Sequence, residues 1–122
     1  MNNPKLITEI ESRNDLVPLL LTNPGLIILK FGAEWCGPCK RIEEDIDDYF
    51  NKMPSTVQCG IIDVDNSFDL YACLKKKKII STIPAILCYI KGNDTFVPDE
   101  ILMSSDKNEL KTFINKCKNH LQ

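Results

Sequence analysis

Apolar residues lie along the chain in short continuous runs and in stripes of helical spacing. Residues 26–31 form such a run between turn residues, which is typical of a strand buried on both faces of a parallel sheet. Residues 57–64 and 85–90 predict two further strands, and residues 5–10 predict a short first strand. Strands that alternate with helical segments indicate an α/β fold.

The helical segments are amphipathic. Beyond Cys36, apolar residues from Ile42 to Met53 recur one turn apart while acidic residues occupy the opposite face, which predicts one long helix. Asp106 stands three residues before Glu109 at the start of the last apolar stripe, as in a capping box. The other predicted helices cover residues 16–21, capped by Asn14 or Asp15, and residues 68–74, capped by Asn66 or Ser67.

The strand over residues 85–90 is followed by a hairpin-like turn at residues 91–94. Residues 95–101 are then its predicted antiparallel partner, with Pro98 suited to an edge position. We therefore expect a central mixed sheet of four or five strands flanked by helices on both faces. The chain has no internal repeat and no long Pro/Gly/Ser linker, so residues 1–122 are predicted to form a single domain.

Charge and hydropathy exclude several classes of partner. A net charge of −2 argues against a nucleic-acid-binding protein, which needs a clustered basic surface. The apolar runs 16–21 and 26–29 are separated by turn residues, and the N-terminus leads into no apolar stretch of signal length. We expect no nucleic-acid or membrane partner and a cytoplasmic, intracellular location.

The chain contains six cysteines. A chain of this size folds without disulfide staples, so reduced thiols are expected. Only Cys36 and Cys39 are close in sequence, and the single cysteines are expected to be small buried apolar residues, with Cys73 the best suited to a regulatory role: Cys59, Cys73, Cys88 and Cys117. No second C-x-x-C pair completes a zinc site, and the single histidine, His120, offers no base for Cys–His catalysis.

The pair Cys36 and Cys39 lies in the segment Trp35-Cys36-Gly37-Pro38-Cys39, between a predicted buried strand and a predicted helix. Cys36 falls at the helix N-terminus, where free backbone N–H groups and the helix dipole favour a thiolate. Cys39 lies one turn further in and is expected to be more buried. We predict that Cys36 attacks a substrate disulfide and that Cys39 resolves the mixed disulfide.

Residues 31–40, Phe-Gly-Ala-Glu-Trp-Cys-Gly-Pro-Cys-Lys, resemble the active-site segment of the thioredoxin family. Further on, Asp63-Val64-Asp65 resembles the third strand of that family, Ile83-Pro84 its cis-proline loop, and Gly92 the turn glycine that faces this loop. The resemblance spans nearly the whole chain in the family's order. It implies a thioredoxin fold.

The resemblance also implies how substrates and electrons arrive. Ile83 and Pro84 would lie beside Cys36 and offer backbone groups with which an extended client segment pairs. Trp35, Gly37 and Gly92 would shape the rest of the docking surface. The family pattern implies no bound cofactor, electrons from NADPH through a thioredoxin reductase, and disulfide-containing client proteins as partners. We expect a monomer.

Three departures from the family pattern stand out. Lys30 occupies the place of a buried aspartate that is thought to take the proton of the resolving cysteine; it is then a neutral base, a cation that favours the thiolates, or a side chain that reaches water. Glu44 replaces a proline that kinks the long helix, so a straighter helix is expected. The segment 72–81 looks longer than usual, and its lysines 75–78 either dock an acidic partner or form a solvated helix end.

We predict a dithiol reductant of protein disulfides. Two alternatives remain: a specialised oxidant or isomerase with the same chemistry, and a noncatalytic binding module that uses the groove without turnover. The Gly37-Pro38 spacer favours the reductant by resemblance, whereas the redox poise depends on which of the two redox forms is stabilised.

Overall fold

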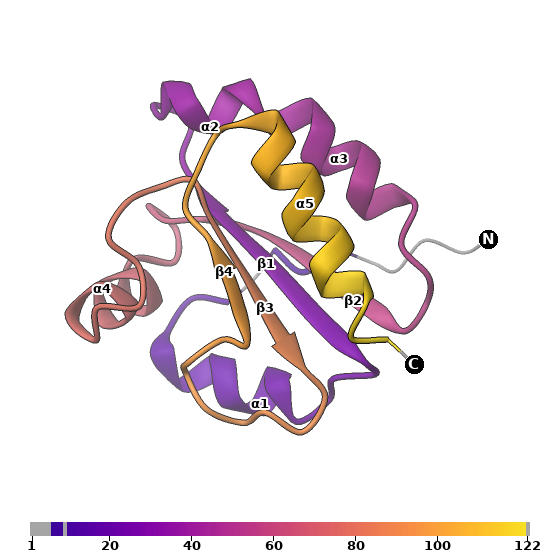
Figure 1. Cartoon of the computed structure of the whole chain (residues 1–122). Coiled ribbons are helices and arrows are strands. Elements are labelled where there is room, and N and C mark those ends of the chain that lie inside the picture. The colour runs from indigo at the N-terminus through magenta and orange to yellow at the C-terminus, as the bar shows by residue number, and fades with distance from the viewer. Residues whose placement is uncertain (1–5, 9, 122) are drawn as a thin grey trace.

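In the computed structural model, which describes residues 6–8 and 10–121, a four-stranded sheet lies between two layers of helices (Figure 1). The strands are β1 (Leu26–Gly32), β2 (Val57–Asp63), β3 (Ala85–Ile90) and β4 (Glu100–Leu102). The helices are α1 (Leu16–Leu20), α2 (Gly37–Arg41), α3 (Glu43–Asn51), α4 (Phe68–Lys76) and α5 (Lys107–Lys118).

The sheet is mixed, as the sequence predicts, with the strand order β2-β1-β3-β4. β1 pairs parallel to β2 and antiparallel to β3, and β3 pairs antiparallel to β4. At the end of β1, Gly32 lies opposite Asp63 and Phe31 lies opposite Ala85. The carboxyl ends of β1 and β2 and the start of β3 therefore lie side by side at one end of the sheet.

Alternate residues of β1 face opposite layers, and all seven are buried. Ile27, Leu29 and Phe31 pack in one hydrophobic cluster with residues of α1 and α4, whereas Leu26 and Ile28 pack in a second cluster with residues of α3 and α5. Figure 1 shows the same two layers, with α3 and α5 on one side of the sheet. A strand sealed by helices on both faces gives the segment that follows it a rigid base.

The long helix predicted beyond Cys36 is interrupted. Ile42, with φ −108° and ψ 5°, ends α2 and begins α3, so the expectation of a straighter helix is wrong. The acidic residues Glu43, Glu44 and Asp45 occupy the first turn of α3, where negative charge stabilises a helix N-terminus. Because the same residues restart a helix favourably, the chain bends here without a proline, and Ile42 is carried into the core.

The predicted strand over residues 95–101 is reduced to β4. Residues 95–99 form a loop around Asn93, whose side-chain amide donates to the Val97 carbonyl at 2.9 Å and whose Oδ1 accepts from the Thr95 N–H at 2.9 Å. This local bonding competes with strand pairing. Pro98 accordingly lies in the loop before β4 rather than at an edge position within a strand.

The first predicted strand is reduced to a single bridge in the described residues. Ile7 pairs parallel to Gly60 on β2; its N–H donates to the Cys59 carbonyl at 2.9 Å and its carbonyl accepts from the Ile61 N–H at 3.0 Å. Residues 5 and 9 of the expected strand lie outside the described residues. Ile7 thus covers part of the outer edge of β2.

The helix caps are partly as predicted. Asp15 is the N-cap residue of α1, as one of the two predicted choices, although its side chain makes no capping hydrogen bond there. Ser12 caps the short 3-10 turn before α1 and forms a capping box with Asp15. Ser67 is the residue before α4, although its side chain makes no capping hydrogen bond. Asp106 caps α5 by accepting from the backbone N–H groups of Asn108 and Glu109.

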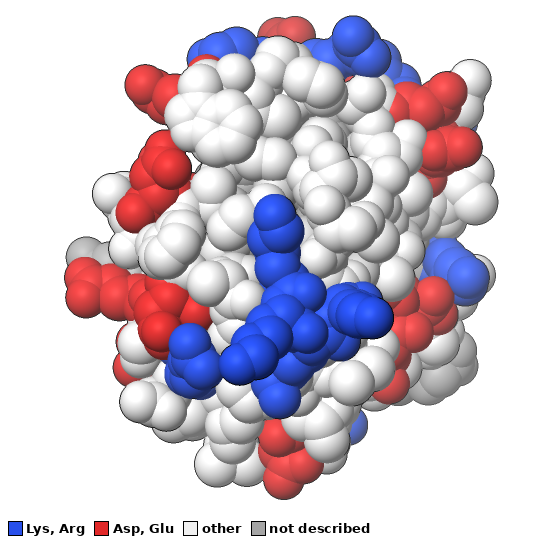
Figure 2. Space-filling model, turned by 90° about the vertical axis from the view of Figure 1, so that its left-hand side faces the viewer, with Lys and Arg blue, Asp and Glu red and all other residues white. Residues whose placement is uncertain are grey.

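The predicted basic run lies at the C-terminal end of α4, and its four lysines are all exposed. Figure 2, which views the molecule from the side of α4, shows basic side chains gathered in one cluster. The Nζ of Lys75 lies 5.4 Å from the ring centre of Tyr71, and that of Lys77 lies 5.0 Å from that of Phe96. The run is a solvated helix end whose lysines partly rest on aromatic rings.

Candidate active site

Cys36 and Cys39 lie at the start of α2, shortly after β1 ends, at the end of the sheet where β1, β2 and β3 lie side by side. Cys36 is the N-cap of α2, and the two cysteines form a disulfide with 5.3 Å between their Cα atoms. The Cys36 Sγ accepts a hydrogen bond from the Cys39 backbone N–H at 3.1 Å. A sulfur in this position receives a backbone donor that favours its thiolate once the disulfide is reduced.

The two sulfurs differ in their surroundings. Cys36 is 5% exposed and its Sγ lies 3.9 Å from the carbonyl oxygen of Ile83. Cys39 is 2% exposed and its Sγ faces Gly32. Cys36 is therefore the sulfur beside the loop, and Cys39 is the sulfur turned towards the sheet.

The Ile83–Pro84 peptide bond is cis, as the sequence led us to expect. Pro84 precedes β3 directly, so the loop stands beside the end of β1 and beside Cys36. Met103 follows β4 on the other side of this loop, and its sulfur accepts from the Ser81 N–H at 3.3 Å. Ile83 thus borders Cys36, and Met103 contacts the same loop two residues earlier, at Ser81.

The expectation that Gly92 faces this loop is wrong. Gly92 follows the far end of β3, beside Gly25, where the Lys91 N–H donates to the Gly25 carbonyl at 2.9 Å. The six residues of β3 separate it from Pro84, a span of roughly 20 Å for an extended strand. Its φ of +102° serves the turn after β3.

Trp35 is 67% exposed, and its ring is held by a residue that the sequence reasoning did not assign. The indole Nε1–H donates to Asp65 Oδ2 at 2.9 Å. The Asp65 N–H in turn donates to Asp63 Oδ1 at 2.8 Å. A signal for Asp65 was available: an Asp-x-Asp sequence ends the strand parallel to β1, and the ends of parallel neighbours meet at one edge.

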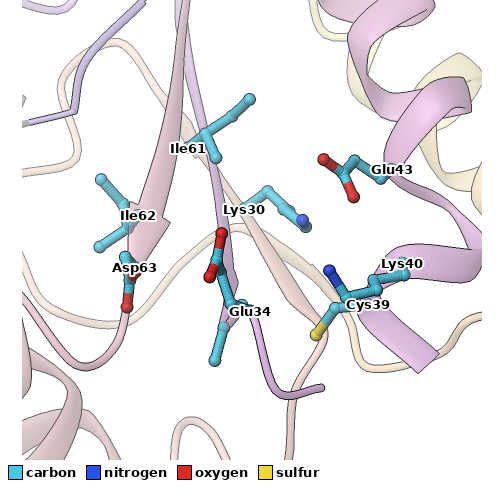
Figure 3. Close-up of a pocket in the computed structure, with 10 residues that line it drawn as sticks. Lys30, Glu34, Cys39, Lys40, Glu43, Ile61, Ile62 and Asp63 are labelled. Atoms are coloured by element: carbon cyan, nitrogen blue, oxygen red, sulfur yellow. The ribbon is translucent and has the colours of Figure 1, made fainter. Parts of the chain in front are cut away.

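A cavity of about 180 Å³ opens behind the cysteine pair. Lys30, Cys39 and Glu43 are among its lining residues, and Figure 3 shows the Lys30 amine pointing into the space between Glu43 and Cys39. Lys30 is 7% exposed, so its side chain does not extend into open solvent. This placement does not fit one of the three roles left open for Lys30, that of a side chain that reaches out to bulk water.

Several neighbours act on the Lys30 amine. Burial lowers the pKa of Lys30 because a charged amine loses hydration there, and the nearby Lys40 lowers it further. Glu43 and Asp47, both on α3, act in the opposite sense and raise this pKa. The net direction is downward, with two carboxylates still favouring the ammonium form.

The single cysteines are all buried, which agrees with their expected role as small apolar residues. Burial raises the pKa of Cys59 to about 12. A hydrogen bond with Cys117, together with burial, raises the pKa of Cys88. The thiols of Cys59 and Cys88 therefore stay protonated at neutral pH and are poor nucleophiles.

Within residues 6–8 and 10–121, no three His, Cys, Asp or Glu side chains gather closely enough to hold a metal ion. None of the helices in the same part of the chain has the length and apolar character needed to span a bilayer.

Comparisons with known proteins agree with this geometry. The thioredoxin family model matches residues 12–116. A thioredoxin of Mycoplasma pneumoniae is 34% identical over 89 residues, 73% of this chain and 81% of that protein. The mitochondrial thioredoxin of Mus musculus is 29% identical over 90 residues, 74% of this chain and 50% of that longer protein. The solved structure of Trichomonas vaginalis thioredoxin has a TM-score of 0.75 at 23% identity, covering 94% of this chain and 98% of that one.

The chain belongs to the thioredoxin family. With Cys36 and Cys39 at disulfide distance, it is a thiol–disulfide oxidoreductase that acts on protein disulfides. Thioredoxins need no bound cofactor, because the cysteine pair itself carries the electrons. Disulfide-containing proteins are accordingly its class of client.

Proposed function

We propose that the chain works as a reductant of client disulfides, with Cys36 as the nucleophile and Cys39 as the resolving cysteine. The observation that carries this assignment is the position of Cys36 Sγ, which accepts the Cys39 N–H and borders the Ile83 carbonyl. Cys36 is the sulfur on the loop side, where a client segment can approach. Cys39 follows in the first turn of the same helix and reaches the Cys36 sulfur, with which it forms a disulfide.

The exchange proceeds in two displacements. The Cys36 thiolate attacks one sulfur of the client disulfide, and the other client sulfur leaves as a thiolate that takes up a proton. Cys39 then loses its proton and attacks Cys36 Sγ, which forms the Cys36–Cys39 disulfide and releases the second client sulfur. Two electrons pass from the cysteine pair to the client, which leaves as a dithiol.

The client segment docks at the rim beside Cys36. Ile83 and Pro84 present backbone groups to it, so an extended segment can add to the loop as a short strand. Trp35 and Gly37 flank the attacking sulfur on the other side, and Pro38 holds the first turn of α2 at a position where a proline fits. We include Met103 in this surface in place of Gly92, because its sulfur contacts the loop at Ser81.

The remaining features of the proposal rest on the family relationship. A thioredoxin reductase would reduce the Cys36–Cys39 disulfide with electrons from NADPH. The chain would then act as an electron carrier between the reductase and its clients. We place this activity in the cytoplasm and in a monomer, with residues 1–122 as one domain.

Trapping tests the assignment of the two cysteines. A Cys39→Ser variant lacks the resolving thiol and is expected to retain clients as mixed disulfides, whereas Cys36→Ser traps none. The same pair of variants is assayed for insulin reduction with dithiothreitol. Activity of the unmodified chain no greater than that of Cys36→Ser would exclude the reductant and favour the noncatalytic binding module.

The oxidant or isomerase alternative is favoured by one observation, the buried cationic side chain of Lys30 close to Cys39. A positive charge at this site stabilises the reduced form and so moves the reduction potential upwards. The measured potential, compared with that of glutathione, separates the alternatives.

A further inference from the structure

Lys30 is the charged side chain most deeply placed in the sheet. It lies in the middle strand β1, where its partners across the register are Ile61 on β2 and Ile86 on β3. Neither partner can neutralise an ammonium, and among the described residues no carboxylate lies within salt-bridge distance of its Nζ. A buried charge without a direct partner is costly, so its position calls for an explanation in function.

The Lys30 amine lies close to the sulfur of Cys39. If Gly32 carried a Cβ, that atom would lie 3.3 Å from Lys30 Nζ and 3.2 Å from Cys39 Sγ. The amine and the sulfur therefore border one small space, which the missing side chain of Gly32 keeps open. Both residues also line the cavity behind the cysteine pair (Figure 3).

Resting on the thiol–disulfide exchange proposed above, we propose that the Lys30 ammonium stabilises the thiolate of Cys39, which speeds the resolving step and raises the reduction potential of the cysteine pair. In the mixed disulfide Cys36 carries no charge, so the effect of Lys30 falls on Cys39. When the Cys36–Cys39 disulfide forms, the thiolate is consumed and the ammonium loses this partner. The reduced form is thus favoured over the oxidised form, which is the condition for a more oxidising pair.

The other charges around the cavity fit this role. Glu43 and Asp47 face Lys30 from α3 and hold it in the ammonium form, while Lys40 on α2 opposes them. Glu34 before α2 and Asp63 at the end of β2 also line the cavity. Glu43 and Asp47 favour the ammonium form of Lys30, yet among the described residues no carboxylate pairs with it at salt-bridge distance, so the ammonium remains available to a new anion at Cys39.

The test is a charge series at residue 30 with a matched control. Lys30→Arg keeps the positive charge, Lys30→Met removes it at similar length, and Lys30→Asp reverses it. Lys40→Met is the control, because Lys40 is the other lysine that lines the cavity but is exposed. A methionine at a buried strand position is compatible with folding, and unfolding curves verify this for each variant.

Two equilibrium measurements report on the proposal. The reduction potential is obtained by equilibration with glutathione, and the ionisation of Cys39 is followed by thiolate absorbance in a Cys36→Ala background, with the double alanine variant as the blank. At an effective dielectric constant of about 20, the attraction between two unit charges this close changes an equilibrium constant by more than a factor of ten. Water in the cavity weakens this attraction. We expect Lys30→Met to shift the glutathione equilibrium about tenfold towards the disulfide, equivalent to about 30 mV.

The expected pattern is an ordered one. The pH at which Cys39 ionises rises by about one unit in Lys30→Met, rises further in Lys30→Asp, and stays close to the original value in Lys30→Arg and Lys40→Met. Unchanged potential and titration in a folded Lys30→Met would overturn the proposal, and so would equal shifts in Lys30→Arg and Lys30→Met, which indicate a packing effect. Because both measurements are equilibria of the chain itself, they stand apart from the insulin assay, whose failure would remove the proposed function alone.

Discussion

Replacing Asp65 by alanine removes the acceptor that holds the Trp35 ring at the edge of the cysteine pair. The hydrogen bond is 2.9 Å long and joins two exposed side chains, so we assign it the lower part of the usual net range, about 0.5–1 kcal/mol. Loss of that energy lowers the ratio of the oriented to the freely moving Trp35 ring by about two- to fivefold. If the client packs on Trp35, the KM for insulin reduction rises by a similar factor, while the reduction potential stays unchanged.

The chain offers a direct probe of this contact, because Trp35 is its only tryptophan. Fluorescence anisotropy and quenching by acrylamide therefore report on this ring alone, and both should indicate a more mobile and more accessible indole in Asp65→Ala. Asp65→Asn is the matched control, since its amide oxygen can still accept from Nε1–H. An Asp65→Ala variant with the original anisotropy and the original KM would refute the view that Asp65 orients the ring.

Three other predictions concern stability and reactivity. Ile46→Ala removes a fully buried side chain between α3 and the sheet and should lower the free energy of unfolding by about 2–5 kcal/mol, whereas Leu21→Ala, at a position 70% exposed, should change it little; urea unfolding measures both. A hydrogen bond from His120 lowers the pKa of Glu100, so this carboxylate stabilises the fold above its ordinary pKa and loses that effect as the pH falls; the difference in the free energy of unfolding between the original chain and Glu100→Gln should shrink as the pH falls through the lowered pKa of Glu100. Burial raises the pKa of Cys59 to about 12, so iodoacetamide at neutral pH should modify this thiol only after unfolding, as mass spectrometry would reveal; rapid modification in the folded state contradicts the reasoning.

The features that the sequence predicted best are those set by local pattern. A continuous apolar run places β1 in the middle of the sheet, and the C-x-x-C pair after it falls at the start of α2. Asp106 could be identified as a cap from the sequence because a capping side chain bonds to backbone N–H groups only two or three residues away. In each case the sequence signal lies within a few residues.

The features that were missed depend on a contact between distant segments, on the length of a strand and on an unrecognised local cause of a helix break. Asp65 meets Trp35 across 30 residues, and its partner follows from the strand register, which the sequence does not state. Gly92 was assigned to the loop rim because its turn resembles a family turn, but the length of β3 carries it to the far end of the sheet. The break at Ile42 was missed because a proline was taken as its cause, whereas the acidic first turn of α3 suffices.

The bridge at Ile7 has a consequence for the behaviour of the protein in concentrated solution. β2 is an outer strand of the sheet, and its unpaired backbone groups can template the addition of a strand from another molecule. Ile7 occupies two of these groups from within the same chain. Fraying of this one residue would expose these backbone groups to other molecules, so we expect the tendency to aggregate to depend on a contact that involves neither active-site cysteine.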